Sequence, residues 1–339
     1  MPRPALRLLV PLALAVALLL ALGTGPGDVG PGEALRSLYA HLAAPLGLAD
    51  APTGLRDAIV WQLRLPRALL AAVVGAALAS AGVLTQGLFR NPLADPGVLG
   101  VSAGAALAAV FGFMLGAEQH GLWVTPLLAA GGAALVLLAL LGLHRVGQSL
   151  ATLLLSGFAL GTLCGAVATL CLSLAAQRWD LGLRVMQWSL GSFEGRTWVH
   201  LAWSLPPCAA GLALAASQLR DLDTLHLGHD TAASLGVDLG RLRRRAVLAV
   251  GLLVGAATAL TGILGFVGLL VPHLARMLVG AGHRRLLPLA AGLGAALVVL
   301  VDTLARSVTS VLLAPGVVTS LLGAPLFLWL LRRRGLADV

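Results

Sequence analysis

The chain has 339 residues, of which 58% are hydrophobic and only 11% are charged. About half apolar residues already fill the core of a soluble domain, so this composition excludes a water-soluble protein and indicates an all-α, polytopic membrane protein. Every residue counted as lysine or arginine is an arginine. A Walker-type phosphate loop needs its lysine to reach the terminal phosphates. If the protein works with ATP, a partner chain must bind the nucleotide and Mg²⁺, and we expect no cofactor here.

Hydropathy along the chain predicts about ten membrane-spanning helices. Arg3 and Arg7 precede the first apolar run, which we expect to remain as an uncleaved helix. Residues 23–58 are expected to form an external loop, and a short internal turn is predicted at 144–148. The predicted spans are 8–22, 59–89, 97–115, 123–143, 150–174, 199–216, 246–262, 266–279, 286–304 and 311–331.

Two polar intervals interrupt this pattern. Residues 177–198 carry three tryptophans, which favours an outer segment at the membrane–water interface. Residues 217–245 form the longest polar stretch and are predicted to lie inside. Threading the chain from an internal N-terminus places most arginines on the internal side, as the positive-inside rule requires, and puts both termini in the cytoplasm.

An internal repeat links the two halves of the chain. The pattern GAAxAxxGxL occurs at 75–84 and again at 255–264, and a proline follows each copy. The two copies run in opposite directions in the predicted topology, so we expect an inverted repeat of the kind transporters use. We treat residues 1–339 as one transmembrane domain. Its parts are 1–58 (first span and external loop), 59–176 (first repeat), 177–245 (outer segment, sixth span and cytoplasmic loop) and 246–332 (second repeat).

Three arginines fall at the predicted outer ends of spans, where basic residues are scarcer: Arg64, Arg67 and Arg306. They could extend to lipid phosphates or dock an acidic external partner. Arg306 could also pair with Asp302, one helical turn earlier. The spans hold almost no ionisable residue near their middle. This counts against an ion-coupled secondary transporter, which remains the alternative.

The polar loop reads as two short helices separated or closed by Gly228, Gly236 and Gly240. It is the one internal region large enough to dock a partner.

Histidines and aspartates in this loop suggest a metal site, namely Asp223, His226, His229 and Asp230. No further ligand with zinc spacing accompanies them, so we predict no metal. An integral-membrane enzyme would need such a cluster for its chemistry. We therefore predict that the protein is not an enzyme.

Long blocks of the sequence are similar to a known family. They read RLPR…GAALASAGVLTQGLFRNPLADPGVLGVSAG, MQWSLGSFEGRTW, GILGFVGLLVPHLARMLVGAGHRRLLP and VDTLARSV…APGVVTSLLGAPLFLWLL. They resemble the permease subunits of bacterial ABC importers for iron(III)-siderophores, haem and cobalamin, the FecCD family. The resemblance covers nearly the whole chain after residue 58. One departure is Leu313-Ala314, where many members carry an acidic residue.

The resemblance implies a type II importer permease of ten helices in the bacterial cytoplasmic membrane. It implies a dimer with a second copy or a paralogue, two internal ATPase subunits, an external binding protein, and no nucleic acid. Arg64, Arg67 and Arg306 are then expected to meet glutamates of the binding protein, and Asn91 and Leu93 to lie in the inner gate region. The element expected to contact the ATPase contains Leu225, Gly228, Ala232, Leu235 and Gly236. Among the cargoes, siderophore-iron is expected on family breadth alone.

Overall fold

The computed structural model describes residues 4–25, 29–48, 50, 53–143, 150–174, 179–307 and 313–334. Within these ranges every regular element is helical, which confirms the all-α class. The helices are α1 (Pro4–Gly23), α2 (Pro31–Ala43), α3 (Leu55–Ala58), α4 (Leu65–Phe89), α5 (Val101–Met114), α6 (Val124–Leu143), α7 (Leu150–Leu174), α8 (Trp179–Ser189), α9 (Trp198–Ser217), α10 (Leu219–Leu225), α11 (His229–Ser234), α12 (Leu239–Thr261), α13 (Val267–Val279), α14 (His283–Ser307) and α15 (Pro315–Arg334).

Six helices in the described residues are long and apolar enough to cross a membrane. They are Leu55–Phe89, which includes α3 and α4, together with α6, α7, α9, α12 and α14. Shorter apolar helices lie in α1, α5, α13 and α15. All of these helices coincide with predicted spans. The start of the tenth predicted span, 311–312, and the predicted turn at 144–148 lie outside the described residues.

The structure adds helices between the predicted spans and moves one boundary. The expected external loop 23–58 contains the helices α2 and α3. The predicted outer segment 177–198 contains α8. Helix α12 begins at Leu239, well before the predicted start at 246, because the Asp238 carboxylate accepts a hydrogen bond from the Arg241 amide at 2.8 Å and caps the helix. Gly240 therefore lies within α12 and closes no shorter helix, which corrects the prediction for that glycine.

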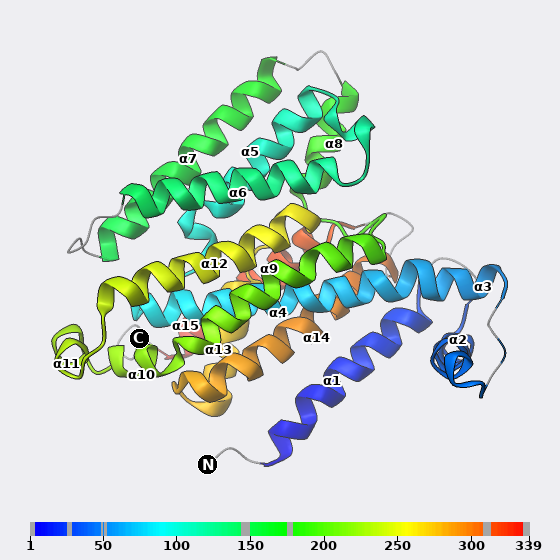
Figure 1. The fold of residues 1–339 in the computed structure, drawn as a ribbon, viewed down its shortest axis with the longest axis horizontal. Coiled ribbons are helices and arrows are strands. Elements are labelled where there is room, and N and C mark those ends of the chain that lie inside the picture. The colour runs from blue at the N-terminus through cyan, green and yellow to red at the C-terminus, as the bar shows by residue number, and fades with distance from the viewer. Residues whose placement is uncertain are drawn as a thin grey trace.

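Helix α4 lies at the centre of the fold (Figure 1), with α9, α12, α13 and α14 packed around it. Small residues allow these backbones to approach closely. A Cβ atom on Gly75 would lie 2.1 Å from the carbonyl oxygen of Gly294 in α14, and one on Gly82 would lie 1.8 Å from that of Gly268 in α13. In Figure 1, α5, α6 and α7 form a group on one side of this centre, and α1 lies at the opposite edge.

A π-helix, η2 (Ile59–Arg64), leads into α4. Pro66 explains it in part, because proline cannot donate a backbone hydrogen bond and the preceding turn must widen or break. The carbonyl of Trp61, five residues before Pro66, instead accepts a hydrogen bond from the indole Nε1 of Trp198 at 2.8 Å. This bond ties the start of α9 to the start of α4.

We predict that Gly82→Ala lowers the melting temperature of the purified protein, because the new methyl group would force α4 away from α13. Overpacking of this kind costs about 1–3 kcal/mol. The matched control is Gly131→Ala in α6, where a Cβ meets nothing within 4 Å. Equal melting temperatures for the two variants would contradict the close packing of α4 on α13.

Candidate functional site

Two polar regions lie at opposite ends of α4. We call the region around Arg64, Arg67 and Arg306 the arginine end, and the region around Asn91 and helices α10 and α11 the loop end. The 25 residues of α4 separate them by about 37 Å, at 1.5 Å per residue. The sequence prediction singled out the residues of both regions. In the structure the three arginines lie together at one end of α4, and the Asn91 turn and the polar loop lie together at the other.

At the arginine end, two guanidinium groups face the carbonyl end of α1. Arg64 Nη1 donates to the carbonyl oxygens of Leu22 at 2.6 Å and Val29 at 3.0 Å. Arg306 Nη2 donates to the carbonyl of Ala21. Both side chains are buried, with exposed fractions of 4% and 9%. The helix end carries partial negative charge, so these contacts stabilise it, and both guanidinium groups are turned toward the protein.

Arg67 makes a bidentate ion pair with Asp302. Arg67 Nε lies 2.8 Å from Oδ2 of Asp302, and Nη2 lies 2.7 Å from Oδ1. Asp302 is 2% exposed, so Arg67 takes the place of water as the partner of this carboxylate. Arg306 Nε lies farther from the same carboxylate, at 3.8 Å. The predicted pair of Asp302 with Arg306 within α14 is therefore weaker than the pair of Asp302 with Arg67, which joins α14 to α4.

A fourth arginine joins this group. Arg196, in the segment before α9, lines a cavity of about 210 Å³ together with Arg64, Arg67 and Arg306. Burial lowers the pKa of Arg196 to about 10, which leaves it protonated at neutral pH. Sequence reasoning missed this residue, although it lies in the quoted block MQWSLGSFEGRTW. With Asp302 as the only acidic residue in these contacts, the cavity has a basic lining.

At the loop end, α4 stops in a Schellman-type turn. Arg90 takes a left-handed conformation, with φ at 50°, and the Asn91 amide donates to the carbonyl of Gln86 at 3.2 Å. The side-chain oxygen of Asn91 then accepts from the amide of Leu93 at 2.8 Å. The segment predicted as the gate region is therefore a tight turn directly after the central helix.

The polar loop forms two short helices, α10 and α11, as predicted. Gly228, with φ at 119°, separates them, and Gly236, with φ at 87°, follows α11. Both angles favour glycine. Leu225 and Ala232 are buried against the helix ends, whereas Leu235 is 64% exposed. The loop therefore has one side anchored on the helix bundle and one exposed side.

A histidine attaches this loop to the helix bundle. His283 is fully buried at the start of α14, and its Nδ1 lies 2.7 Å from Oδ1 of Asp223 in α10. The ring lies against Gly87 of α4, where a Cβ would sit 2.4 Å from its Nε2. The ring of His226 stacks on His283 with centroids 5.1 Å apart, and burial lowers the pKa of His226. One contact thus connects the loop, α14 and the end of α4.

Asp223 is engaged with His283, and the described residues contain no group of three or more histidine, cysteine or acidic side chains that could hold a metal ion.

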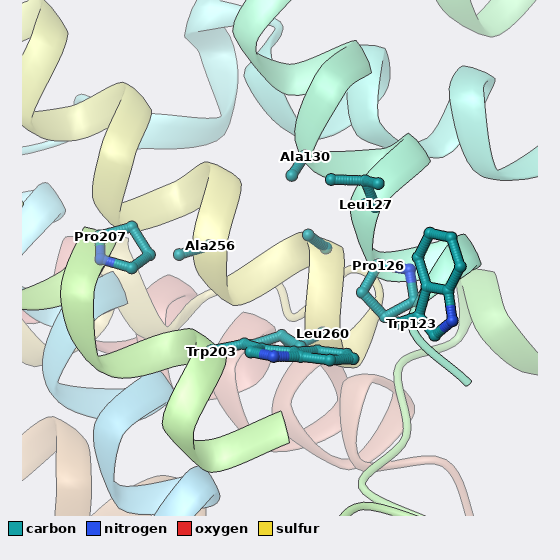
Figure 2. Close-up of a pocket in the computed structure, with 9 residues that line it drawn as sticks. Trp123, Pro126, Leu127, Ala130, Trp203, Pro207, Ala256 and Leu260 are labelled. Carbon is teal, nitrogen blue, oxygen red and sulfur yellow. The ribbon is translucent and has the colours of Figure 1, made fainter. Parts of the chain in front are cut away.

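A separate apolar cavity of about 370 Å³ lies between α6, α9 and α12. Figure 2 shows Trp203 and Trp123 near one end of it and Ala256 along its wall. No charged residue lines it, so it has no part in the polar sites at the helix ends.

A bundle of long, close-packed apolar helices, with charged side chains gathered at the two ends of α4, is the architecture of a multi-pass membrane protein. A family model for the FecCD transport family matches residues 13–333, and the chain belongs to this family.

Relatives and solved structures are consistent with this. The chain is 45% identical over 286 residues to the vitamin B12 import system permease protein BtuC of Vibrio cholerae, covering 83% of this chain and 85% of that protein. It is 38% identical over 324 residues to the protein of the same name from Escherichia coli O17:K52:H18, covering 95% and 93%. A solved structure of a metal-chelate type ABC transporter in an inward-facing conformation superposes with a TM-score of 0.83 at 30% identity, covering 98% and 100%. The fold is therefore that of an ABC transporter permease, and the chain is a multi-pass inner-membrane protein.

We predict that Asp302→Asn destabilises the protein by about 3–5 kcal/mol, because it leaves the half-buried Arg67 and the buried Arg306 without their carboxylate. Unfolding in detergent by chemical denaturant measures the effect. The control is Asp180→Asn, which removes the exposed pair with Arg184 and should cost less than about 1 kcal/mol. A loss at Asp302 no larger than at Asp180 would show that the Arg67 pair contributes little.

Proposed function

We propose that the protein is the permease subunit of an ABC importer that moves a corrinoid of the vitamin B12 type across the inner membrane. The observation that carries this is the match along almost the whole chain to vitamin B12 import permeases at 45% and 38% identity. These relatives favour a corrinoid over the siderophore-iron expected from family breadth. A metal chelate is the second candidate, since the superposed structure is of a metal-chelate type transporter.

In this proposal ATP is hydrolysed by two partner subunits at the loop end, which faces the cytoplasm together with both termini. The chain has no lysine for a phosphate loop of its own. The exposed Leu235 and the glycine-bounded helices α10 and α11 form the surface that the ATPase would contact. Movement of this surface would reach the Asn91 turn through His283, which touches both Asp223 and Gly87.

The arginine end would receive the acidic external binding protein. Arg64 and Arg306 donate to carbonyls of the α1 end, so glutamates of a partner would have to share or replace those acceptors. Docking would then loosen α1 from α4 and α14. Arg67 is the most accessible of the three, with 18% of its side chain exposed.

The dimer would use the faces that the single chain leaves open. Only 17% of the apolar window of α7 is buried, and Leu321, Leu322 and Leu328 of α15 are exposed. The translocation path would run along this dimer axis. An inverted repeat carrying 75–84 and 255–264 would supply the two related halves that alternating access requires.

The test is transport in liposomes. The protein is co-purified with its ATPase, and uptake of radiolabelled cyanocobalamin is measured with the binding protein outside and Mg-ATP inside. We expect uptake that needs ATP hydrolysis and stops when the partner's Walker lysine is replaced. Uptake driven by a proton or sodium gradient without any ATPase would instead establish the secondary transporter.

The role of Arg67 in docking can be separated from its role in the ion pair. We predict that Arg67→Asp combined with Asp302→Arg retains the pair and the stability of the protein while weakening binding-protein affinity. Surface plasmon resonance on nanodiscs measures the affinity, and Arg184→Asp, at an exposed site, is the control. Unchanged affinity in a stable double variant would remove Arg67 from the docking surface.

We predict that Gly228→Leu uncouples ATP hydrolysis from uptake. A leucine side chain is strained at φ of 119°, so the junction of α10 and α11 must rearrange. ATPase rate and uptake are measured on the same liposomes. The matched control is Gly240→Ala, a helical glycine in α12 that should keep the ratio of transport to hydrolysis; the same ratio in the Gly228 variant would contradict a coupling role.

A further inference from the structure

Helix α2 presents its apolar side outward. Leu35, Tyr39 and Leu42 follow one another at intervals of four and three residues, which places them on one face of α2. Leu46 follows in η1 (Ala44–Leu46), the short 3₁₀ helix directly after α2. Their exposed fractions lie between 51% and 72%. A surface helix of a soluble protein shows the opposite arrangement, with its apolar face packed on the core. We call these four residues the α2 stripe.

The polar side of α2 faces the protein. Glu33 pairs with Arg56 of α3, and the Ser37 hydroxyl donates to Asp57 of the same helix. His41 lies 3.5 Å from Asp57 through its Nδ1. Glu33, Ser37 and His41 therefore find partners in α3, and the α2 stripe is the side that needs a covering partner.

The depth of α2 is set by two tryptophans. The ring of His41 stacks on Trp61 with centroids 3.8 Å apart, and Trp61 accepts the indole hydrogen bond of Trp198. Trp61 and Trp198 lie at the start of the membrane spans containing α4 and α9. Tryptophan and tyrosine gather at the level of the lipid head groups, so α2 and its Tyr39 lie at that level.

The direction of α2 agrees with this depth. Figure 1 shows α2 nearly end-on, whereas α4, α12 and α14 run across the picture, so α2 crosses the direction of the spans. It lies beyond the end of α1, whose exposed Leu12, Val16 and Leu19 form an apolar surface leading toward it. The α2 stripe carries no charge and is continuous with an apolar helix surface, as expected for contact with lipid. An acidic protein partner would instead require basic side chains in the stripe.

We propose that α2 is an interfacial helix that lies in the membrane plane, with the α2 stripe in contact with the outer-leaflet boundary between lipid head groups and acyl chains. This contact anchors the segment between α1 and α4 to the bilayer. It also holds the loop that follows α1 beside the arginine end. The inference rests on the membrane-spanning fold and is independent of the cargo and of the energy source.

The experiment measures depth by spin labelling of the full chain in nanodiscs of phosphatidylethanolamine and phosphatidylglycerol. Nitroxides are attached to Tyr39→Cys and Leu42→Cys, and their collisions with oxygen and with a water-soluble nickel chelate are compared. The native cysteines Cys164, Cys171 and Cys208 are buried, and the unsubstituted protein reports any background labelling. Leu12→Cys on α1 calibrates the lipid value, and Arg36→Cys, at an exposed position of α2 outside the α2 stripe, calibrates the aqueous value.

We expect labels at both stripe positions to show high oxygen and low nickel accessibility, close to the values for the Leu12→Cys label and far from those for the Arg36→Cys label. Nickel accessibility equal to that of the Arg36→Cys label would overturn the proposal. A fall in nickel accessibility that appears only after an acidic binding protein is added would assign the stripe to that partner. Dipolar broadening between labels would assign it to a second copy. If the Leu42 variant does not fold, Leu46→Cys supplies the second position.

Discussion

Close approach of helix backbones around α4 is the constraint on which the rest of the structure depends. Lipid tails are as apolar as leucine side chains, so moving apolar side chains from lipid into a helix interface gains little free energy. Helices in a membrane therefore associate through van der Waals packing and hydrogen bonds. Gly75 and Gly82 provide that packing because they bring α14 and α13 to the surface of α4 with no side chain between them. A central helix enclosed in this way forms a rigid axis, and its two ends hold the polar groups.

The two ends differ in how they treat charge. At the arginine end, charge is buried and compensated by Asp302 and by carbonyls of α1, so the contacts are strong and directional. At the loop end, a single buried histidine joins α10, α14 and α4, while the neighbouring Leu235 remains exposed. Both ends therefore make their contacts with the same two helices, α4 and α14. In the proposed importer, these two helices are the physical route for coupling across about 37 Å of α4.

Helix α2 shows how the surrounding solvent determines which face of a helix is turned outward. Polar side chains of α2 find their partners in α3 and Ala34 packs beside Leu22 and Val60, whereas the apolar side chains of the α2 stripe stay exposed. In water this arrangement would be costly, whereas at a lipid boundary it is favourable. The sequence prediction described residues 23–58 as a loop because that interval is rich in glycine, proline and mixed charge. A short amphipathic helix inside it does not reach the length of a membrane span.

The sequence by itself determined the all-α class, the positions of the apolar helices and the two short helices around Gly228. These features depend on local properties, namely runs of apolar residues and a backbone angle that favours glycine. The sequence also identified the family, because long sequence blocks in a fixed order seldom match a family by chance. The tertiary structure alone decided that Asp302 pairs chiefly with Arg67, which is 235 residues away, while its neighbour Arg306 turns to α1. It also added Arg196 to the basic cavity and His283 to the loop. Such partners meet only when helices distant in the chain pack together, and no local pattern records which helices those are.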